Sequence, residues 1–95
     1  MISVYITSFN KESFLFRSIE SVLKQSLSAG EIIIIDDAST DNSVQIIEGF
    51  KSRYPNLIKT IYNEQNHGIS RTRNLAIKAC NGELISYLDG DDIFY

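Results

Sequence analysis

The strongest chemical signal in the sequence is the run Asp89-Gly90-Asp91-Asp92, which directly follows an apolar segment. Carboxylates this close together repel one another, and either exposure to water or a hard cation with oxygen ligands stabilises them. Taken alone, such a run is more often a solvated turn than a metal site. A second acidic pair, Asp36-Asp37, also follows a very apolar segment. The sequence therefore predicts that both groups of acids face one cleft, where a divalent cation carrying a phosphate ligand completes the site.

Groups that could balance the negative charge of a phosphate lie in residues 68–74. The helix expected to begin there offers free amides and a positive dipole end, and Arg71 and Arg73 can add bidentate contacts. For either arginine alone, an exposed charge on the helix surface is an equally good interpretation. His67 is interpreted as a loop hydrogen-bonding residue, because no second histidine is present, and Cys80 as a small core residue.

The loop Thr7-Ser8-Phe9-Asn10 contains no glycine, so it matches neither the dinucleotide-binding G-x-G-x-x-G motif nor a P-loop. It offers hydroxyls, backbone groups and the ring of Phe9, which could stack on a flat base, while Asp37 could accept a hydrogen bond from a ring N–H. Phe9 as an ordinary core side chain fits the sequence equally well. A base pocket, a cation and a phosphate site at one edge describe a nucleoside diphosphate bound through a metal.

The elements that must position these groups follow from the apolar periodicity. Strands are predicted at Ile2–Ile6, Glu31–Ile35, Leu57–Tyr62 and Glu83–Leu88, with helical stripes between them. Asn10 is the expected N-cap of the first helix, Pro55 stops the second, and the third runs from about Ile69 to Cys80. The order βαβαβαβ predicts an α/β protein with a parallel sheet, helices on both faces and every strand-to-helix loop along one edge.

Length, charge and cysteine count exclude several classes of protein. Ninety-five residues allow one domain, and the chain, which stops directly after its most acidic loop, is interpreted as the front half of a larger unit. The net charge of −3, with nine scattered basic residues, argues against a nucleic-acid partner. A single cysteine excludes an internal disulfide. With no apolar run near the roughly 20 residues of a membrane span, we expect a cytoplasmic protein, or one held peripherally at the cytoplasmic face of the membrane in its full-length form.

Five blocks of the sequence, in this order and spacing, resemble the family 2 glycosyltransferases of the GT-A fold. They are residues 2–11, 18–26, 31–41, 66–74 and 82–92, and together they cover essentially the whole chain. The resemblance implies the N-terminal, nucleotide-sugar-binding part of a GT-A domain, without its acceptor-binding half. The family's activity is transfer of a sugar from a nucleotide diphosphate sugar, by habit a UDP-sugar, to an acceptor hydroxyl with inversion.

The resemblance also implies roles for individual residues. The first loop and Asp37 hold the base, Asp89 the ribose, and Asp91 a Mn²⁺ or Mg²⁺ ion that bridges the diphosphate, with Arg71 or Arg73 near the phosphates. Many members have Pro-Thr-Tyr-Asn where this chain has Thr7-Ser8-Phe9-Asn10, so a tyrosine hydroxyl is absent here. The residues assigned to the donor are thus Thr7, Phe9, Asn10, Asp37, Arg71, Arg73 and Asp89, with Asp91 on the metal.

No catalytic residue is assigned within the chain, because the family's general base lies downstream of the position matching Tyr95. We therefore expect this polypeptide to bind the donor without transferring sugar to its acceptor, a saccharide or a lipid-linked molecule, and to self-associate through the truncated edge of its sheet. Two alternatives are a non-catalytic nucleotide-binding or assembly module of the same fold and a receiver-type phosphoacceptor domain. The receiver domain should have an aspartate ending its third strand, where this chain has Asn63-Glu64, and a fifth strand, which is not predicted.

Overall fold

The computed structural model describes residues 2–25, 29–81 and 84–89, and for Ile2, Gln25, Ala29, Ile69 and the last of these segments it describes the backbone alone. The elements are β1 (Ile2–Ser8), α1 (Glu12–Gln25), β2 (Ala29–Asp36), α2 (Ser43–Arg53), β3 (Ile58–Tyr62), α3 (Ile69–Ala79) and β4 (Leu84–Asp89). The strands form one parallel sheet in the order β3-β2-β1-β4. The predicted βαβαβαβ order is confirmed.

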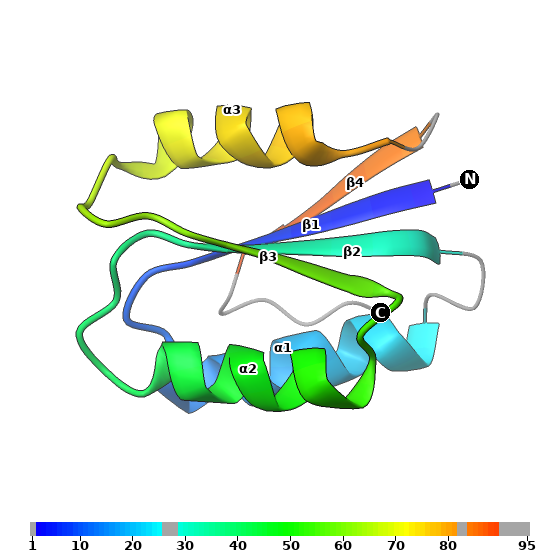
Figure 1. Ribbon diagram of the computed structural model, residues 1–95, viewed down its shortest axis with the longest axis horizontal. Helices are drawn as coiled ribbons and strands as arrows, with labels where there is room; N and C mark the ends of the chain where they lie inside the picture. The colour runs from blue at the N-terminus through cyan, green and yellow to red at the C-terminus, as the bar shows by residue number, and fades with distance from the viewer. Residues whose placement is uncertain (1, 26–28, 82–83, 90–95) are drawn as a thin grey trace.

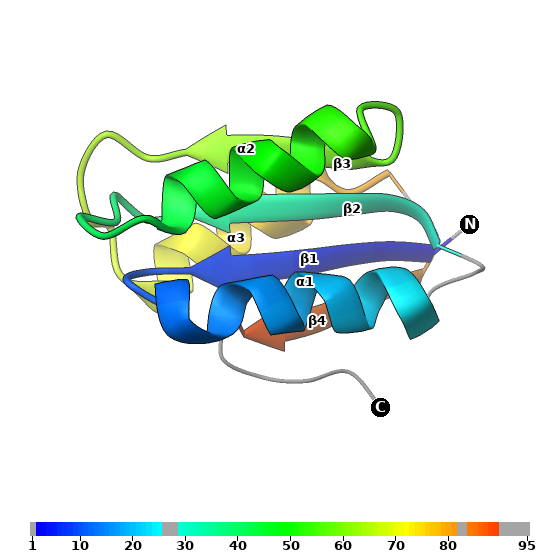
Figure 2. The same ribbon diagram turned by 90° about the horizontal axis from the view of Figure 1, so that it is seen from below.

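The helices cover both faces of the sheet, as predicted. Helices α1 and α2 lie side by side on one face, and α3 lies alone on the other among the described elements (Figure 1, Figure 2). This division follows from the strand order, because the chain steps one way from β1 to β3 and then returns across the sheet to β4. Right-handed crossovers in opposite directions place their helices on opposite faces.

The core consists of two apolar layers separated by the sheet. The isoleucine run Ile32–Ile35 is fully buried and supplies both layers, since successive strand residues point to opposite faces. Ile32 and Ile34 pack with Leu15, Ile19 and Phe50 against α1 and α2, whereas Ile33 and Ile35 pack with Ala76 under α3. The central place expected for this strand is therefore confirmed, and the rigid sheet fixes the loops at its carboxyl edge.

The ends of the helices show one confirmed prediction and one error. Helix α2 ends at Arg53, two residues before Pro55, as predicted. The expected capping of α1 by Asn10 is wrong, because the amide of Glu12 donates instead to Oδ2 of Asp41 at 3.1 Å. The other oxygen of Asp41 accepts from the amide of Ser43 at 2.9 Å. The carboxylate of Asp41 thus accepts a hydrogen bond from the first backbone amide of both α1 and α2.

A buried carboxylate ties the sheet together at its amino edge. Glu31 is 2% exposed and accepts hydrogen bonds from Oγ of Ser3 at 2.5 Å, from Nζ of Lys59 at 2.7 Å and from the backbone amide of Asn81. Burial acts to raise the pKa of Glu31, but the bonds from Asn81, Lys59 and Ser3 outweigh it and lower that pKa from 4.5 to about 2. This cluster joins β1, β2, β3 and the segment after α3.

Ala38 provides a local test of backbone strain. It has φ of +62°, in the left-handed region that costs a residue with a Cβ roughly 1–2 kcal/mol. Ala38→Gly is expected to raise the free energy of unfolding by about 0.5–1 kcal/mol, because relief of this strain exceeds the entropy that glycine adds to the unfolded chain. Urea denaturation measures the change.

Ala76→Gly in the buried interior of α3 is the matched control for this substitution. It should lower the free energy of unfolding by about 1 kcal/mol or more, the opposite sign, because glycine is a poor helix former and leaves space in the core. A loss of stability in Ala38→Gly of the same size would contradict the strain argument.

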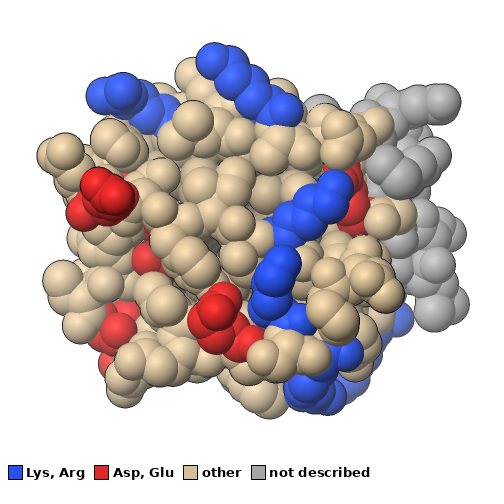
Figure 3. Space-filling model, viewed as in Figure 1, with Lys and Arg blue, Asp and Glu red and all other residues tan. Residues whose placement is uncertain are grey.

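The surface of the protein carries charges of both signs. Lys and Arg share the face seen in Figure 3 with Asp and Glu. In the part of the chain that the structure describes, no helix has the length and apolar character to cross a membrane. Strand β4 lies at one edge of the sheet as far as the described residues extend, and self-association through it stays a prediction.

Candidate functional site

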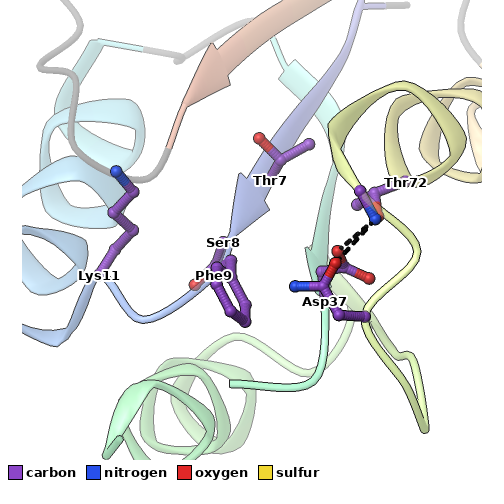
Figure 4. Close-up of a pocket in the computed structure, with 8 residues that line it drawn as sticks. Thr7, Ser8, Phe9, Lys11, Asp37 and Thr72 are labelled. Atoms are coloured by element: carbon purple, nitrogen blue, oxygen red, sulfur yellow. Dashed lines mark hydrogen bonds between the residues drawn. The ribbon is translucent and has the colours of Figure 1, made fainter. Parts of the chain in front are cut away.

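A pocket of about 360 Å³ opens at the carboxyl edge of the sheet, between the first turn of α3 and the loops after β1, β2 and β3 (Figure 4). The residues that line it are Thr7, Ser8, Phe9, Lys11, Asp37, Asn66, Gly68 and Thr72. Three of the residues assigned from the sequence, Thr7, Phe9 and Asp37, are among them. The structure therefore brings these three together, although they come from two different strand-to-helix loops.

Asp37 is the carboxylate in the wall of the pocket, and it is 4% exposed. Its Oδ1 accepts from Nδ2 of Asn63 at 2.9 Å and from the amide of His67 at 2.8 Å, and its Oδ2 accepts from the amide of Gly68 at 3.0 Å. Burial acts to raise the pKa of Asp37, but these bonds outweigh it, so the pKa lies below its usual value of 3.8. Asp37 is therefore a fixed negative charge that holds the loop before α3.

Gly68 is required at the start of α3 because of its backbone conformation. Its φ of +81° and ψ of 164° lie in a region that is essentially restricted to glycine. The Gly68 amide donates to Oδ2 of Asp37, which Figure 4 labels in the pocket wall. One turn further along α3, Thr72 is 1% exposed and lines the same pocket. His67 contributes its backbone amide here, as a loop residue, in agreement with its interpretation from the sequence.

The end of β1 forms the opposite wall. Thr7 is 5% exposed and pairs in register with Asp89 of β4, so the backbone of Asp89 lies at the same edge as the pocket. Phe9, two residues further, is 42% exposed. Phe9 is therefore not a core side chain, and its ring is available at the pocket for stacking (Figure 4).

The remaining residues assigned from the sequence lie outside the pocket lining. Arg71 and Arg73 are exposed on the first turns of α3, and Asn10 is exposed in the loop after β1. The side chain of Asp89 and the whole of Asp91 lie outside what the structure describes. The roles of these residues therefore stay predictions.

The expectation that Asp36 and Asp37 face one cleft is wrong. Oδ1 and Oδ2 of Asp36 accept from the hydroxyl of Ser39 at 2.5 Å and from its amide at 2.9 Å, in the loop that leads to α2. Asp37, one residue on, points to the α3 side of the sheet. The alternation of side chains along β2 continues through this pair, and it sends the two carboxylates to opposite faces.

Lys11, Asn66 and Thr72 line the pocket although none was assigned to the donor from the sequence, and Ser8 was included only as a member of the first loop. Thr72 could have been found, because it lies one helical turn after the Gly68 that begins the helix. Ser8 is 3% exposed, and its Oγ has no hydrogen-bond partner among the described residues. A buried hydroxyl without a partner is costly, so it marks a place where a bound group or a neighbouring segment is needed.

The described residues alone do not supply a metal site. No group of three or more His, Cys, Asp or Glu side chains gathers among residues 2–25, 29–81 and 84–89. Asp36 and Asp37 use their oxygens on protein donors. The acids that suit a hard cation are therefore those of the run after β4, at the end of the strand that lies beside Thr7.

A parallel α/β sheet with its pocket at the carboxyl edge, a buried acid in one wall and an exposed aromatic ring in the other is the architecture of a nucleotide-binding domain. The glycosyl transferase family 2 model matches residues 3–95, and the chain belongs to that family. This membership excludes the receiver-type alternative.

Individual relatives agree with this membership. The chain is 44% identical to the minor teichoic acid biosynthesis protein GgaA of Bacillus subtilis, over 99% of this chain and 22% of GgaA. It superposes on S. aureus TarS 1-349 in complex with UDP-GlcNAc with a TM-score of 0.83 at 33% identity, over 97% of this chain and 27% of TarS. It matches GalNAc-T7 with UDP, GalNAc and Mn²⁺ at a TM-score of 0.81 and 30% identity, over 95% of this chain and 18% of that one. The fold is thus that of the N-terminal part of GT-A enzymes, and the chain spans less than a third of these relatives.

Proposed function

We propose that this chain is the donor-binding part of a glycosyltransferase that moves a sugar from a UDP-sugar to an acceptor hydroxyl with inversion. The observation that carries the proposal is the pocket in which Thr7, Phe9 and the buried Asp37 meet at the carboxyl edge of the sheet. UDP as the nucleotide is supported by TarS, whose complex holds UDP-GlcNAc, and by GalNAc-T7, whose complex holds UDP.

The proposed arrangement assigns one part of the donor to each group. The ring of Phe9 stacks on the base, and Asp37 accepts a hydrogen bond from the base N–H. Asp89 holds the ribose, and Arg71 or Arg73 lies near the phosphates. Asp91 holds Mn²⁺ or Mg²⁺, which when bound acts as a Lewis acid for the leaving nucleoside diphosphate. The complex of GalNAc-T7 with Mn²⁺ supports a metal of this kind.

Transfer with inversion also needs a general base to deprotonate the acceptor hydroxyl as it attacks the anomeric carbon. No residue of this chain is assigned to that role, so donor binding and transfer are separable properties in this proposal. The chain alone is expected to bind UDP and to transfer no labelled sugar. The alternative, a non-catalytic nucleotide-binding or assembly module, predicts donor binding without transfer even when an acceptor-binding half of the family is supplied.

Isothermal titration calorimetry with UDP, in the presence and absence of Mn²⁺, tests the donor site. We expect saturable binding that strengthens about tenfold or more with Mn²⁺, equivalent to about 1.4 kcal/mol. GDP and dTDP, titrated in parallel, measure the selectivity for the base. An absence of heat with UDP and Mn²⁺, in a chain that circular dichroism shows to be folded, would refute the proposal.

A further inference from the structure

The aromatic wall of the pocket is only partly covered by the protein. Phe9 is 42% exposed and belongs to the short loop that joins β1 to α1. A partly exposed ring that is held in place before binding stacks more strongly on a ligand, because less conformational entropy is lost when the ligand binds. The position of Phe9 must therefore be set by the backbone on either side of it, and the next residue, Asn10, is where that backbone is fixed.

Asn10 is bound to the neighbouring loop at two points. Its backbone amide donates to Oγ of Ser39 at 2.9 Å, and its side-chain Oδ1 accepts from the backbone amide of Thr40 at 2.7 Å. Its φ of +52° lies in the left-handed region, which asparagine tolerates better than most residues. The side chain of Asn10 is thus used within the protein, on the loop between β2 and α2.

Ser39 is itself fixed from the core. Its hydroxyl donates to Oδ1 of Asp36 at 2.5 Å, and its amide donates to Oδ2 of the same carboxylate at 2.9 Å. Asp36 is 1% exposed at the end of β2. Because the single hydroxyl proton of Ser39 is used on Asp36, the oxygen lone pairs of Ser39 remain for the amide of Asn10. Asn10 therefore donates to Ser39 and Ser39 donates to Asp36, so the backbone next to Phe9 is linked to the end of the rigid sheet.

From this chain of bonds we infer that Asn10 and Ser39, anchored on Asp36, form a relay that holds Phe9 in place for stacking on a planar ring. The inference rests on the proposed function for the identity of that ring, the base of a nucleotide. It changes the role expected from the sequence, since Asn10 becomes a positioning residue that acts through Phe9. The relay also gives a role to Asp36, which does not face the pocket.

A fluorescent reporter tests the relay without relying on a nucleotide. The chain has no tryptophan, so Phe9→Trp introduces a single reporter at the pocket. Its order is measured by time-resolved anisotropy, alone and combined with Asn10→Gly or Ser39→Ala. Asn10→Gly suits this purpose, because glycine keeps the left-handed backbone and removes the bond to Thr40. We expect each substitution to increase the amplitude of the fast component of the anisotropy decay, which reports local rotation of the indole within the folded protein.

The affinity for UDP is then measured with the native Phe9. Asn10→Gly removes the bond to Thr40 and Ser39→Ala removes the bond to the Asn10 amide, so each is expected to weaken UDP binding about tenfold, and the double variant, which loses both attachments of Asn10, more than either. Glu31→Gln, at the opposite edge of the sheet, is the control for stability alone. It should lower the denaturation midpoint and leave both the anisotropy and the affinity unchanged.

The outcomes separate the relay from the proposed function. Increased indole motion in variants of a chain that does not bind UDP would support the relay and refute the proposal that the planar ring is the base of a nucleotide. Weaker UDP binding with unchanged indole motion would overturn the relay, because Asn10 would then act by touching the ligand. Unchanged motion and unchanged affinity in Asn10→Gly would overturn it as well.

Discussion

Replacing Asp37 with alanine is expected to weaken UDP binding at least about 100-fold and to lower the free energy of unfolding by about 3 kcal/mol, the size of effect that follows when a buried charge-assisted cluster loses its acceptor. The side chain of Asn63 and the amides of His67 and Gly68 would each lose their acceptor. The loop before α3, which forms one wall of the pocket, would lose its anchor. Calorimetry with UDP and urea denaturation measure the two effects separately.

Two variants control this prediction. Asp37→Asn retains one acceptor oxygen but turns an NH₂ group toward backbone donors, so it should fall between wild type and alanine in both measurements. Glu31→Gln lowers stability at the other edge of the sheet and should retain UDP affinity. The assignment of Asp37 to the donor site fails if Asp37→Ala remains folded and binds UDP as tightly as wild type.

The largest effect on stability is expected at Glu31. Lys59 is half exposed and can turn to water, but Glu31→Ala leaves the hydroxyl of Ser3 and the amide of Asn81 without their acceptor, so it should cost about 3–4 kcal/mol. That is a large part of the roughly 5–15 kcal/mol typical of a small domain, and the variant should be substantially unfolded at moderate urea concentrations. Glu31→Gln keeps the shape of the side chain and is expected to cost about 1–3 kcal/mol, which urea denaturation can measure.

The contribution of Glu31 also has a defined dependence on pH. Its pKa is about 2 in the folded protein and about 4.5 in the unfolded chain, so between these values the unfolded chain binds more protons. Its stabilising effect is therefore complete above about pH 5 and is lost as the pH falls through 4.5 toward 2. The difference in unfolding free energy between wild type and Glu31→Gln should shrink over this range, and a difference that stays constant from pH 6 to pH 3 would contradict the role of its charge.

The fold could be predicted from the sequence because its signals are local. Four consecutive isoleucines define a strand buried on both faces, and a proline marks the end of a helix, whatever the rest of the chain does. The strand order β3-β2-β1-β4 and the register were not predicted, because the alternation of strands and helices along the chain does not determine which strands pair. The family resemblance and the periodicity led to the same architecture independently.

The site could be predicted only in part, because its details depend on contacts between distant segments. The amide of Glu12 is capped by Asp41, which a local search for a cap before the helix does not find. The bonds that fix Asn10 come likewise from the next loop in space. The opposite directions of Asp36 and Asp37, in contrast, follow from strand periodicity, and the sequence contained the information needed to predict them.

The strand order has a consequence for how the protein acquires its shape during synthesis. Strand β1 is made first, yet one of its two neighbours, β4, is the last strand of the described chain, and Thr7 meets its partner only when Asp89 has been made. Pairing so distant in sequence raises the contact order and slows folding. Until β4 has been made, β1 has one unpaired edge beside the pocket, and such an edge favours pairing with another chain.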